Sequence, residues 1–474
     1  MKVQEKNHTM FIKSAFCEKG SFINTNEVLD WIAEQNRKIK VNIKRVSFKD
    51  LDGWHFDNVK IRHESSKFFT IDGITVTTNW GNINEWDQPI ITQNEVGYLG
   101  FITCEFDSVL HFLVQAKVEP GNVNHVQLSP TLQATKSNYN QIHKGKKPLY
   151  LDYFINAKSE QILLDQLQSE QGSRFLRKRN RNIIIKVDND IPVYDNFIWL
   201  TLAQIKKLMK YDNVVNMDTR TVISGITYGN YTELDNSFLQ DNELAIFPEK
   251  ERLLFLKSAI LTSGQLNTIE EIITMLTHIK SNYDVDITPI PLNKMRNWCI
   301  GENEIYQKDG KYFKIIAVDV EINNREVVKW CQPMVESAQD GICAFVCKEI
   351  NGIIHFAAQT KMECGNKDIV EFAPTVQCLT GNYRLTKDGS LPFLDYVLNA
   401  DKNNIIFDTM QSEEGGRFFR EQNRNLIIIA GDEIPVQLPE KYIWMTLNQL
   451  LFFLKFNNYV NIQARSLISA ISFS

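Results

Sequence analysis

The chain has 474 residues, 43% of them hydrophobic and 23% charged, a balance typical of a globular protein with two or three domains. The formal net charge of −5 offers no basic surface for nucleic acid, so nucleic acid is excluded as an expected partner. There is no apolar stretch of membrane-spanning length, no secretory signal and no metal-binding cysteine spacing, so we expect a cytoplasmic protein with reduced thiols and no membrane partner.

The predicted elements follow one another as a helix, a group of strands and two helical stretches. A helical pattern begins at Asn24-Thr25. Strands are predicted over residues 68–77, 97–106, 109–118, 126–131 and 183–187. Helices are predicted over residues 159–181 and 201–211. Strand runs flanked by segregated helices are typical of an α+β fold with mixed or antiparallel sheets.

The same order recurs in the second half of the chain. Gln88, in Trp-Asp-Gln-Pro, returns 244 positions later as Gln332, in Trp-Cys-Gln-Pro. A second helix start, a capping box made by Thr268 and Glu271, corresponds to the helix start in the first half. We therefore predict two homologous modules, residues 15–224 and 263–474, joined by a linker at 225–262.

A polar hairpin is the most informative part of the repeat. Residues 109–118 alternate between apolar and polar side chains, and Pro120-Gly121-Asn122 then turns the chain. The polar face carries His111, Gln115, Lys117 and Glu119, followed on the returning segment by Gln127, Ser129, Thr131 and Gln133. In module two it carries His355, Gln359, Lys361, Glu363, Thr375 and Gln377. A solvated sheet face is the simpler interpretation. The identical recurrence favours a functional surface.

Each module also contains three arginines at the spacing of one helix face. Arg174, Arg177 and Arg181 recur as Arg417, Arg420 and Arg424. Guanidinium groups suit the paired oxygens of a diphosphate. The alternative is ion pairing with nearby acids such as Glu170 or Glu413.

Longer strings of residues connect these features to a known family. They include Gly97-Tyr98-Leu99-Gly100-Phe101, the run from Phe112 to Asn122, Gln127-Leu128-Ser129-Pro130-Thr131 and Ser137-Asn138-Tyr139. Over nearly its whole length the chain resembles the NDP-hexose 2,3-dehydratase family. The resemblance implies two Nudix-like modules, a dTDP-4-keto-6-deoxyhexose substrate, a homodimer, no metal or nicotinamide cofactor, and one vestigial pocket. The glutamate cluster that binds magnesium in Nudix hydrolases is absent, so a bound nucleotide should stay uncut.

On this resemblance, the expected reaction removes water across carbons 2 and 3 and gives a 3,4-diketo-2,6-dideoxyhexose. It needs a base for the carbon 3 proton, a stabiliser for the enolate and an acid for the leaving hydroxyl. Glu119 is the candidate base, Lys117 or His111 the stabiliser, and Tyr139 or His143 the acid. The candidate substrate-binding residues are Trp86, Gln88, Tyr98, Gln115, Gln127, Ser129, Thr131, Gln133, Asn138, Arg174, Arg177 and Arg181. The second pocket is assigned His355, Gln359, Lys361, Glu363, Thr375, Gln377, Arg417, Arg420 and Arg424.

Several alternatives stay open at this point. Module one is favoured as the active module because Ser129 and His143 are replaced by Ala373 and Lys387 in module two. The replacement of Gln127 by Glu371 adds a carboxylate and points the other way. Glu119 with Lys117 could also be a ladder salt bridge, and His111 a buried structural imidazole. A nucleotide-sugar-binding protein without turnover is the rival function. A metal-dependent diphosphatase is disfavoured by the missing glutamate cluster.

Overall fold

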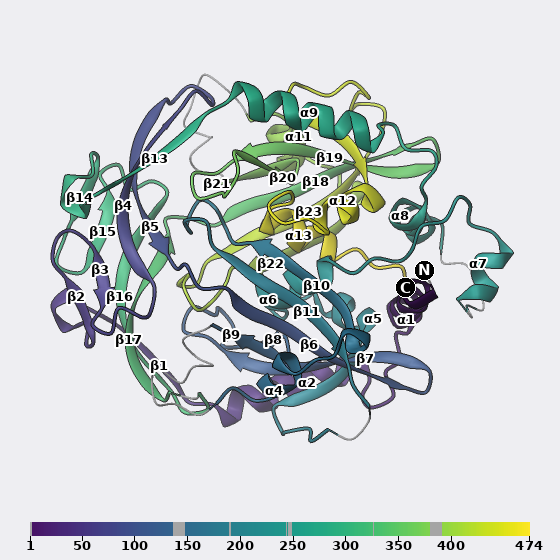
Figure 1. The fold of residues 1–474 in the computed structure, drawn as a ribbon, viewed down its shortest axis with the longest axis horizontal. Coiled ribbons are helices and arrows are strands. Elements are labelled where there is room, and N and C mark those ends of the chain that lie inside the picture. The colour runs from purple at the N-terminus through teal and green to yellow at the C-terminus, as the bar shows by residue number, and fades with distance from the viewer. Residues whose placement is uncertain are drawn as a thin grey trace.

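The computed structural model describes residues 2–135, 147–188, 191–242, 244, 249–325, 327–379 and 391–474. Within these ranges the fold is α+β, as predicted. Two seven-stranded sheets lie one above the other, and two five-stranded sheets lie beside them (Figure 1).

The two large sheets have the same strand order, which confirms the predicted internal repeat. The first contains β10 (Ile162–Ser169), β11 (Arg179–Lys186), β6 (Gly97–Phe106), β7 (Val109–Val118) and β12 (Phe197–Thr201), with β8 (Val126–Ser129) on β7 and β9 (Leu132–Ala134) on β6. The second contains β22 (Ile405–Ser412), β23 (Gln422–Ala430), β18 (Gly341–Ile350), β19 (Ile353–Met362) and β24 (Tyr442–Thr446), with β20 (Val370–Ala373) on β19 and β21 (Val376–Leu379) on β18. In each sheet one pair, β11 with β6 or β23 with β18, is parallel and the others are antiparallel.

Helices cover the large sheets and lie between them. The first half contributes α1 (Lys2–Phe16), α2 (Thr25–Lys38), α4 (Leu151–Ile155), α5 (Leu202–Leu208) and α6 (Met217–Ser224). Later parts of the chain contribute α7 (Asn236–Asp241), α8 (Lys250–Ile260), α9 (Ile269–Asn282), α11 (Leu394–Leu398), α12 (Leu447–Leu454) and α13 (Ile462–Ser469). Short 3-10 turns lie at Phe48–Asp50, Ser159–Gln161, Leu292–Lys294 and Lys402–Asn404. No helix in the described ranges is long and apolar enough to cross a membrane.

The helix starts predicted from capping residues are confirmed. α2 begins after Asn24, whose backbone N–H donates to Glu27. α9 begins after Thr268, whose hydroxyl accepts from the backbone N–H of Glu271 while the Glu271 carboxylate accepts from the backbone N–H of Thr268. These reciprocal bonds satisfy donors that a helix end leaves unpaired.

The expected linker contains a structural part of the repeat. Helix α8 packs on β19 as α1 packs on β7. Ser14 on α1 donates to the Leu110 carbonyl at 2.6 Å, and Ser258 on α8 donates to the Ile354 carbonyl at 2.6 Å. The repeat unit therefore begins with these helices, upstream of the predicted boundaries at 15 and 263.

The helix predicted over residues 159–181 is wrong. The segment forms β10 and the start of β11, with a loop at 170–178 between them. Gly172 lies in this loop, and Arg177 has a φ of 53°, which a right-handed helix does not accommodate. The three arginines therefore do not share a helix face, and the same holds for Arg417, Arg420 and Arg424.

The two small sheets exchange strands between the halves of the chain. One sheet combines β1 (Val41–Val46) of the first half with β14 (Trp298–Ile300), β15 (Glu304–Gln307), β16 (Phe313–Ile322) and β17 (Lys329–Ser337). The other combines β13 (Val285–Ile290) of the second half with β2 (Trp54–Phe56), β3 (Ile61–His63), β4 (Thr70–Thr78) and β5 (Glu85–Thr92). The two halves are therefore interlocked through backbone hydrogen bonds.

A reciprocal contact between hairpin turns and loops joins the halves a second time. The Gly121 N–H donates to the Gly415 carbonyl at 2.7 Å, and the Arg420 N–H donates to the Gly121 carbonyl at 2.8 Å. Gly365 makes the matching bonds with Gly172 and Arg177, both at 2.7 Å. We call these two contacts the glycine clasps. They bring loop 413–421 of the second half to the hairpin of the first, and loop 170–178 to the hairpin of the second.

Two buried arginines reinforce the centre of the molecule, where α6 packs against α13 (Figure 1). Arg220 and Arg465 are each 1% exposed. Arg220 donates to the Ser412 carbonyl, and Arg465 donates to the Ser169 carbonyl, so each guanidinium reaches into the opposite half. Removing either would leave buried acceptors without partners.

Replacing Gly121 with alanine should destabilise the protein, because the added Cβ would lie 1.7 Å from the Phe418 carbonyl oxygen. We expect the free energy of unfolding to fall by about 1–3 kcal/mol or more, the usual cost of overpacking. Gly301→Ala is the control, since its Cβ would meet nothing closer than 3.3 Å. Urea denaturation of both variants measures the effect, and equal unfolding midpoints would show that the clasp tolerates a methyl group.

Candidate active site

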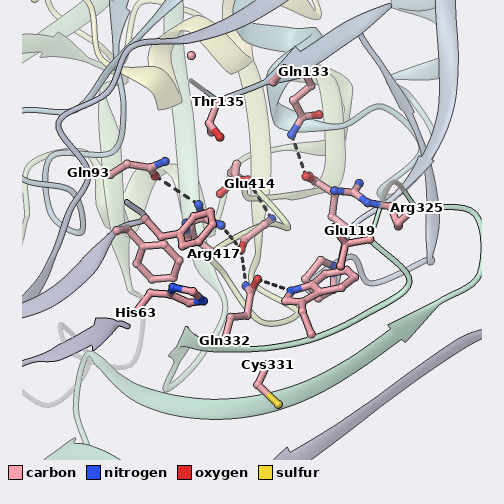
Figure 2. A pocket seen from close by; sticks show the side chains of 18 of the residues that line it. His63, Gln93, Glu119, Gln133, Thr135, Arg325, Cys331, Gln332, Glu414 and Arg417 are labelled. Atoms are coloured by element: carbon pink, nitrogen blue, oxygen red, sulfur yellow. Dashed lines mark hydrogen bonds between the residues drawn. The ribbon is translucent and has the colours of Figure 1, made fainter. Parts of the chain in front are cut away.

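A cavity of about 450 Å³ lies where the first large sheet meets loop 413–421 and the two small sheets (Figure 2). Its walls include Lys117, Glu119 and Gln133 from the first hairpin, Asp218 from α6, Glu414, Gly416 and Arg417 from the second half, Glu170 and Lys178 from loop 170–178, and Trp54, His63, Trp330 and Gln332 from the small sheets. Both halves of the chain thus build one site.

The hairpin places an ammonium, a carboxylate and an amide on one wall. Lys117 and Glu119 are only 9% and 6% exposed. Gln133 donates from Nε2 to Glu119 Oε1 at 2.9 Å, and Lys117 donates from Nζ to the Gln133 carbonyl at 3.3 Å. The alternation of β7 explains this placement, since residues two apart share a face.

Loop 413–421 supplies the opposite wall. Arg417 stacks its guanidinium 4.0 Å from the centre of the Phe69 ring, and its Nη2 donates to Gln93 Oε1 at 3.4 Å. Glu414 accepts from the Gly416 N–H at 2.9 Å through Oε1, while its Oε2 is buried without a hydrogen-bond partner among the described residues. The first glycine clasp fixes this loop against the hairpin.

Three carboxylates converge in the cavity. The oxygens of Glu119, Asp218 and Glu414 lie within 4.8 Å of one another, a spacing at which such a group could hold a metal ion. Burial and the neighbouring Glu119 raise the pKa of Glu414 to about 8. Burial, Glu414 and Glu119 together raise the pKa of Asp218 well above its usual range. Burial and mutual repulsion therefore favour the protonated forms of Asp218 and Glu414.

Further polar groups surround these carboxylates. Burial lowers the pKa of the Lys178 ammonium to about 8, although the negative charge of nearby Glu170 acts in the opposite direction. Burial also raises the pKa of Glu170. Gln332 donates to the Gly416 carbonyl at 2.7 Å and accepts from the Trp330 indole at 2.8 Å (Figure 2). These contacts hold β17 against the loop from the second half.

The equivalent position in the second half has the same framework and different chemistry. Gln377 donates to Glu363 Oε1 at 3.0 Å, and the Gly172 N–H donates to Glu363 Oε2 at 3.1 Å, so both oxygens are engaged. The counterparts of Glu414 and Asp218 in the repeat are Gln171 and Gln463. One carboxylate and two amides thus stand where the first half has three carboxylates.

Arg174 and Arg417, each in a loop of one half, lie beside the hairpin of the other half. Arg417, which the sequence placed in the second pocket, lines the cavity beside Glu119. Arg174, which the sequence placed in the first pocket, stacks 4.0 Å from the Phe313 ring and lies near Glu363. The assignment of each to its own module is wrong, because the glycine clasps carry each loop across.

The other predicted arginines lie away from the cavity. Arg181 makes a paired salt bridge with Asp165 at 2.7 and 2.6 Å, and Arg424 makes the same pair with Asp408. Arg177 and Arg420 are exposed, with backbone N–H groups held in the clasps. Tyr98 accepts from Arg181 at 3.0 Å.

Trp86 and Gln88 lie beside loop 170–178 and do not line the cavity. Gln88 donates to the Ser173 carbonyl at 3.0 Å, and Trp86 packs in an apolar cluster with Cys364 of the second half. Their repeat counterparts, Trp330 and Gln332, line the cavity instead. Because the small sheets exchange strands, the second-half copies line the cavity that the first hairpin forms.

Several predicted hairpin residues hold the fold together. His111 accepts from the Ser21 N–H at 3.2 Å and bonds the Val109 carbonyl at 2.9 Å, and burial lowers its pKa. Thr131 bridges the Leu113 carbonyl and the Ile102 N–H. Gln127 accepts from Ser412 at 2.9 Å. These residues occupy structural positions outside the cavity wall.

Other predicted residues also lie away from the cavity or outside the description. Ser129 donates to Gln133 at 3.1 Å, and Gln115 lies in β7 between β8 and β12. Four of the residues predicted for the second pocket form hydrogen bonds with the backbone: His355, Gln359, Lys361 and Thr375. Asn138, Tyr139 and His143 lie outside the described residues.

Sequence reasoning missed Asp218 and Glu414. Each stands at a repeat position where the other copy has glutamine, Gln463 and Gln171 respectively. A comparison of the two copies for charge differences, rather than for identities, would have found both.

Comparison with known proteins agrees with this duplicated architecture. The family model for NDP-hexose 2,3-dehydratase matches residues 25–226 and again residues 269–471. The chain belongs to the NDP-hexose 2,3-dehydratase family. Among similar proteins, a dTDP-4-dehydro-6-deoxy-alpha-D-glucopyranose 2,3-dehydratase of Saccharopolyspora spinosa is 42% identical over 98% of this chain and 95% of its own. Proteins with the same description from Amycolatopsis orientalis and Streptomyces violaceoruber are 40% and 39% identical, over 97% and 93% of this chain and 92% and 95% of their own.

Removal of the Glu414 carboxylate should change how stability depends on pH. Its pKa of about 8 in the folded protein lies above the ordinary value of 4.5, so the contribution of this carboxyl to wild-type stability falls as pH rises from about 5 to about 8. Glu414→Gln removes this loss. We expect its free energy of unfolding, relative to wild type, to rise over this range by at least about 1 kcal/mol. Denaturant titrations at several pH values measure it.

The matched control is Glu302→Gln, because Glu302 is an exposed partner of Lys49. Its difference from wild type should stay constant over the same range. A constant difference for Glu414→Gln as well would contradict the raised pKa.

Proposed function

We propose that this protein is a dTDP-4-keto-6-deoxyglucose 2,3-dehydratase. It removes water across carbons 2 and 3 to give a 3,4-diketo-2,6-dideoxyhexose. The observation that carries the proposal is the cavity built around Glu119 and Lys117, in a chain whose relatives are described as 2,3-dehydratases along nearly their whole length. A binding protein without turnover has no need of several buried carboxylates, since unpaired buried charge weakens a simple binding site.

The first chemical step is removal of the proton at carbon 3. The ketone at carbon 4 acidifies this proton, and Glu119 takes it. Gln133 occupies one Glu119 oxygen, and no described residue donates to the other, which leaves it for the substrate. Glu363 has both oxygens engaged. This difference supports the first-half cavity as the working site and the second as a vestigial one.

The second requirement is stabilisation of the negative charge on the carbon 4 oxygen. Lys117 lies two residues from Glu119 on the same strand face, so one substrate orientation brings the proton to the base and the ketone oxygen to the ammonium. Burial excludes water and strengthens this interaction. His111 is not suited to the task, because both of its ring nitrogens are engaged by the backbone.

The nucleotide half of the substrate needs cations and an aromatic surface. Arg417 and Lys178 lie on the cavity wall and suit a diphosphate. Trp54, Trp330 and His63 lie on the part of the wall that the small sheets form, where a thymine ring could stack.

Further features are proposed on the family resemblance. The modules are Nudix-like, the protein is a cytoplasmic homodimer, and the reaction needs no metal. Lys117 and Arg417 supply positive charge beside the carboxylates, which supports a reaction without a metal ion.

Glu119→Gln should abolish most turnover with little effect on substrate binding, because it keeps the shape of the side chain and removes its basicity. A general base contributes about 10²–10⁴-fold to the rate. Glu363→Gln is the matched control at the equivalent position and should retain activity. Exchange of the carbon 3 proton in deuterium oxide reports the base step directly. Wild-type exchange by Glu119→Gln would assign the base elsewhere, and loss in Glu363→Gln alone would place the reaction in the second half.

Arg417→Ala should weaken dTDP binding by about 1.5–3 kcal/mol, the usual value of a hydrogen bond to a charged group. Arg181→Ala should leave it unchanged, because its guanidinium is paired with Asp165 outside the cavity. Isothermal titration with dTDP measures both. Equal affinities for the two variants would mean that another cation holds the diphosphate.

A further inference from the structure

The leaving hydroxyl at carbon 2 needs a proton donor. The carboxyl groups of Asp218 and Glu414 are candidates for it. Asp218 is 2% exposed, lines the cavity and has no side-chain hydrogen bond among the described residues. Glu414 Oε2 is also buried and unpartnered within the described chain. A buried carboxylate that no donor satisfies is costly when ionised and inexpensive when protonated.

The charges around the cluster support a shared proton. Glu119 and Glu170 face both Asp218 and Glu414, while Lys117 faces Asp218 and Arg417 faces Glu414. Lys178 offsets the charge of Glu170. The remaining carboxylates, Glu119, Asp218 and Glu414, carry up to three negative charges against the two cations Lys117 and Arg417. One proton carried by Asp218 or Glu414, whose oxygens lie within 4.8 Å of each other, would balance this group. Raised pKa values for both side chains agree with this count.

The repeat provides an internal comparison. Where the first-half site has Asp218 and Glu414, the second has Gln463 and Gln171, which cannot give up a proton. Gln463 is 2% exposed, and both of its amide atoms lack partners among the described residues. The glutamines keep the volume of the site without its acid, so the difference between the sites is one of proton chemistry.

We propose that Asp218 and Glu414, one from each half of the chain, share the proton that leaves with the carbon 2 hydroxyl. This rests on the proposed dehydratase function and assigns its acid to described residues, in place of Tyr139 or His143.

The proposed steps balance. Glu119 takes the carbon 3 proton, and the electrons of that bond form the enolate. The enolate then restores the carbon 4 ketone and forms the bond between carbons 2 and 3. The carbon–oxygen bond at carbon 2 breaks, and the proton from the Asp218–Glu414 pair completes the departing water. The enol formed at carbon 3 becomes a ketone by returning its hydroxyl proton to the pair, while Glu119 delivers its proton to carbon 2. Both acids are thereby restored.

The test separates the two half-reactions in Asp218→Asn and Glu414→Gln. Carbon 3 exchange in deuterium oxide measures proton removal, and trapping of the vicinal diketone with o-phenylenediamine measures elimination. Asp218→Asn should keep exchange within about threefold of wild type and lose about 10²–10⁴-fold in diketone formation. Asp218→Glu should recover part of the loss. Glu414→Gln should move the alkaline limb of the elimination rate to lower pH, because Asp218 then holds its proton less tightly.

Glu371→Gln is the control for loss of a buried carboxyl. Glu371 accepts from Ser169 at 2.7 Å outside the cavity, and its repeat counterpart is already Gln127. It should eliminate at the wild-type rate. A folded Asp218→Asn, shown by a melting temperature no lower than wild type and by wild-type dTDP affinity, is required for the comparison. The pH profile of Glu414→Gln tests the proposal independently.

Three results would overturn the proposal. Wild-type elimination by both Asp218→Asn and Glu414→Gln would exclude the pair as the acid. Equal loss of exchange and elimination would place the cluster at the base step. Loss of wild-type elimination on EDTA treatment, restored by magnesium, manganese or zinc, would make the cluster a metal site. A wild-type protein that neither exchanges nor eliminates would instead refute the proposed function itself.

Discussion

The glycine clasps are the contacts on which the arrangement of the site depends. Each hairpin turn presents a glycine whose backbone lies against the loop of the opposite half, so closely that a side chain would overlap the Phe418 or Phe175 carbonyl. Only this approach brings Glu414 and Arg417 beside Glu119. A duplicated fold would otherwise contain two separate hairpin sites, each completed by its own loop. The clasps instead make every site a product of both halves.

This crossing explains how two similar halves came to hold different chemistry. A substitution in one half alters the site on the hairpin of the other, so a copy can lose its own site while still serving its neighbour's. The second half shows this combination, with Gln463 beside its own hairpin and Glu414 in the first-half cavity. Buried carboxylates reduce the stability of the folded protein. Because they are concentrated in the first-half cavity, this destabilisation is confined to the proposed site of proton transfer.

The sequence predicted the parts of the structure that local patterns determine. The bounds of β7 follow from alternation, those of β6 match the predicted strand at 97–106, and the starts of α2 and α9 follow from capping residues. Lys117 and Glu119 lie together on the cavity wall because residues two apart on an extended chain share a face, and Gln133 meets them from β9. The helix predicted from the arginine triplets is wrong because their spacing matches a helix, while the left-handed backbone of Arg177 and Arg420 interrupts one. Arg417 and Glu414 could not be placed at all, since which loop meets which hairpin is decided by tertiary contacts between the halves.

The exchanged strands of the small sheets have a consequence for the synthesis of the protein. Strand β1 pairs with β16, so residues 41–46 find their partner only after residues 313–322 have been translated. Until then the nascent first half carries an unpaired strand edge, the kind of surface that invites association with other chains. Pairing across so large a separation is also slow, because a long loop must close first. Strand exchange therefore gives the mature enzyme an interlocked architecture, and it leaves β1 without its partner strand while the second half is being translated.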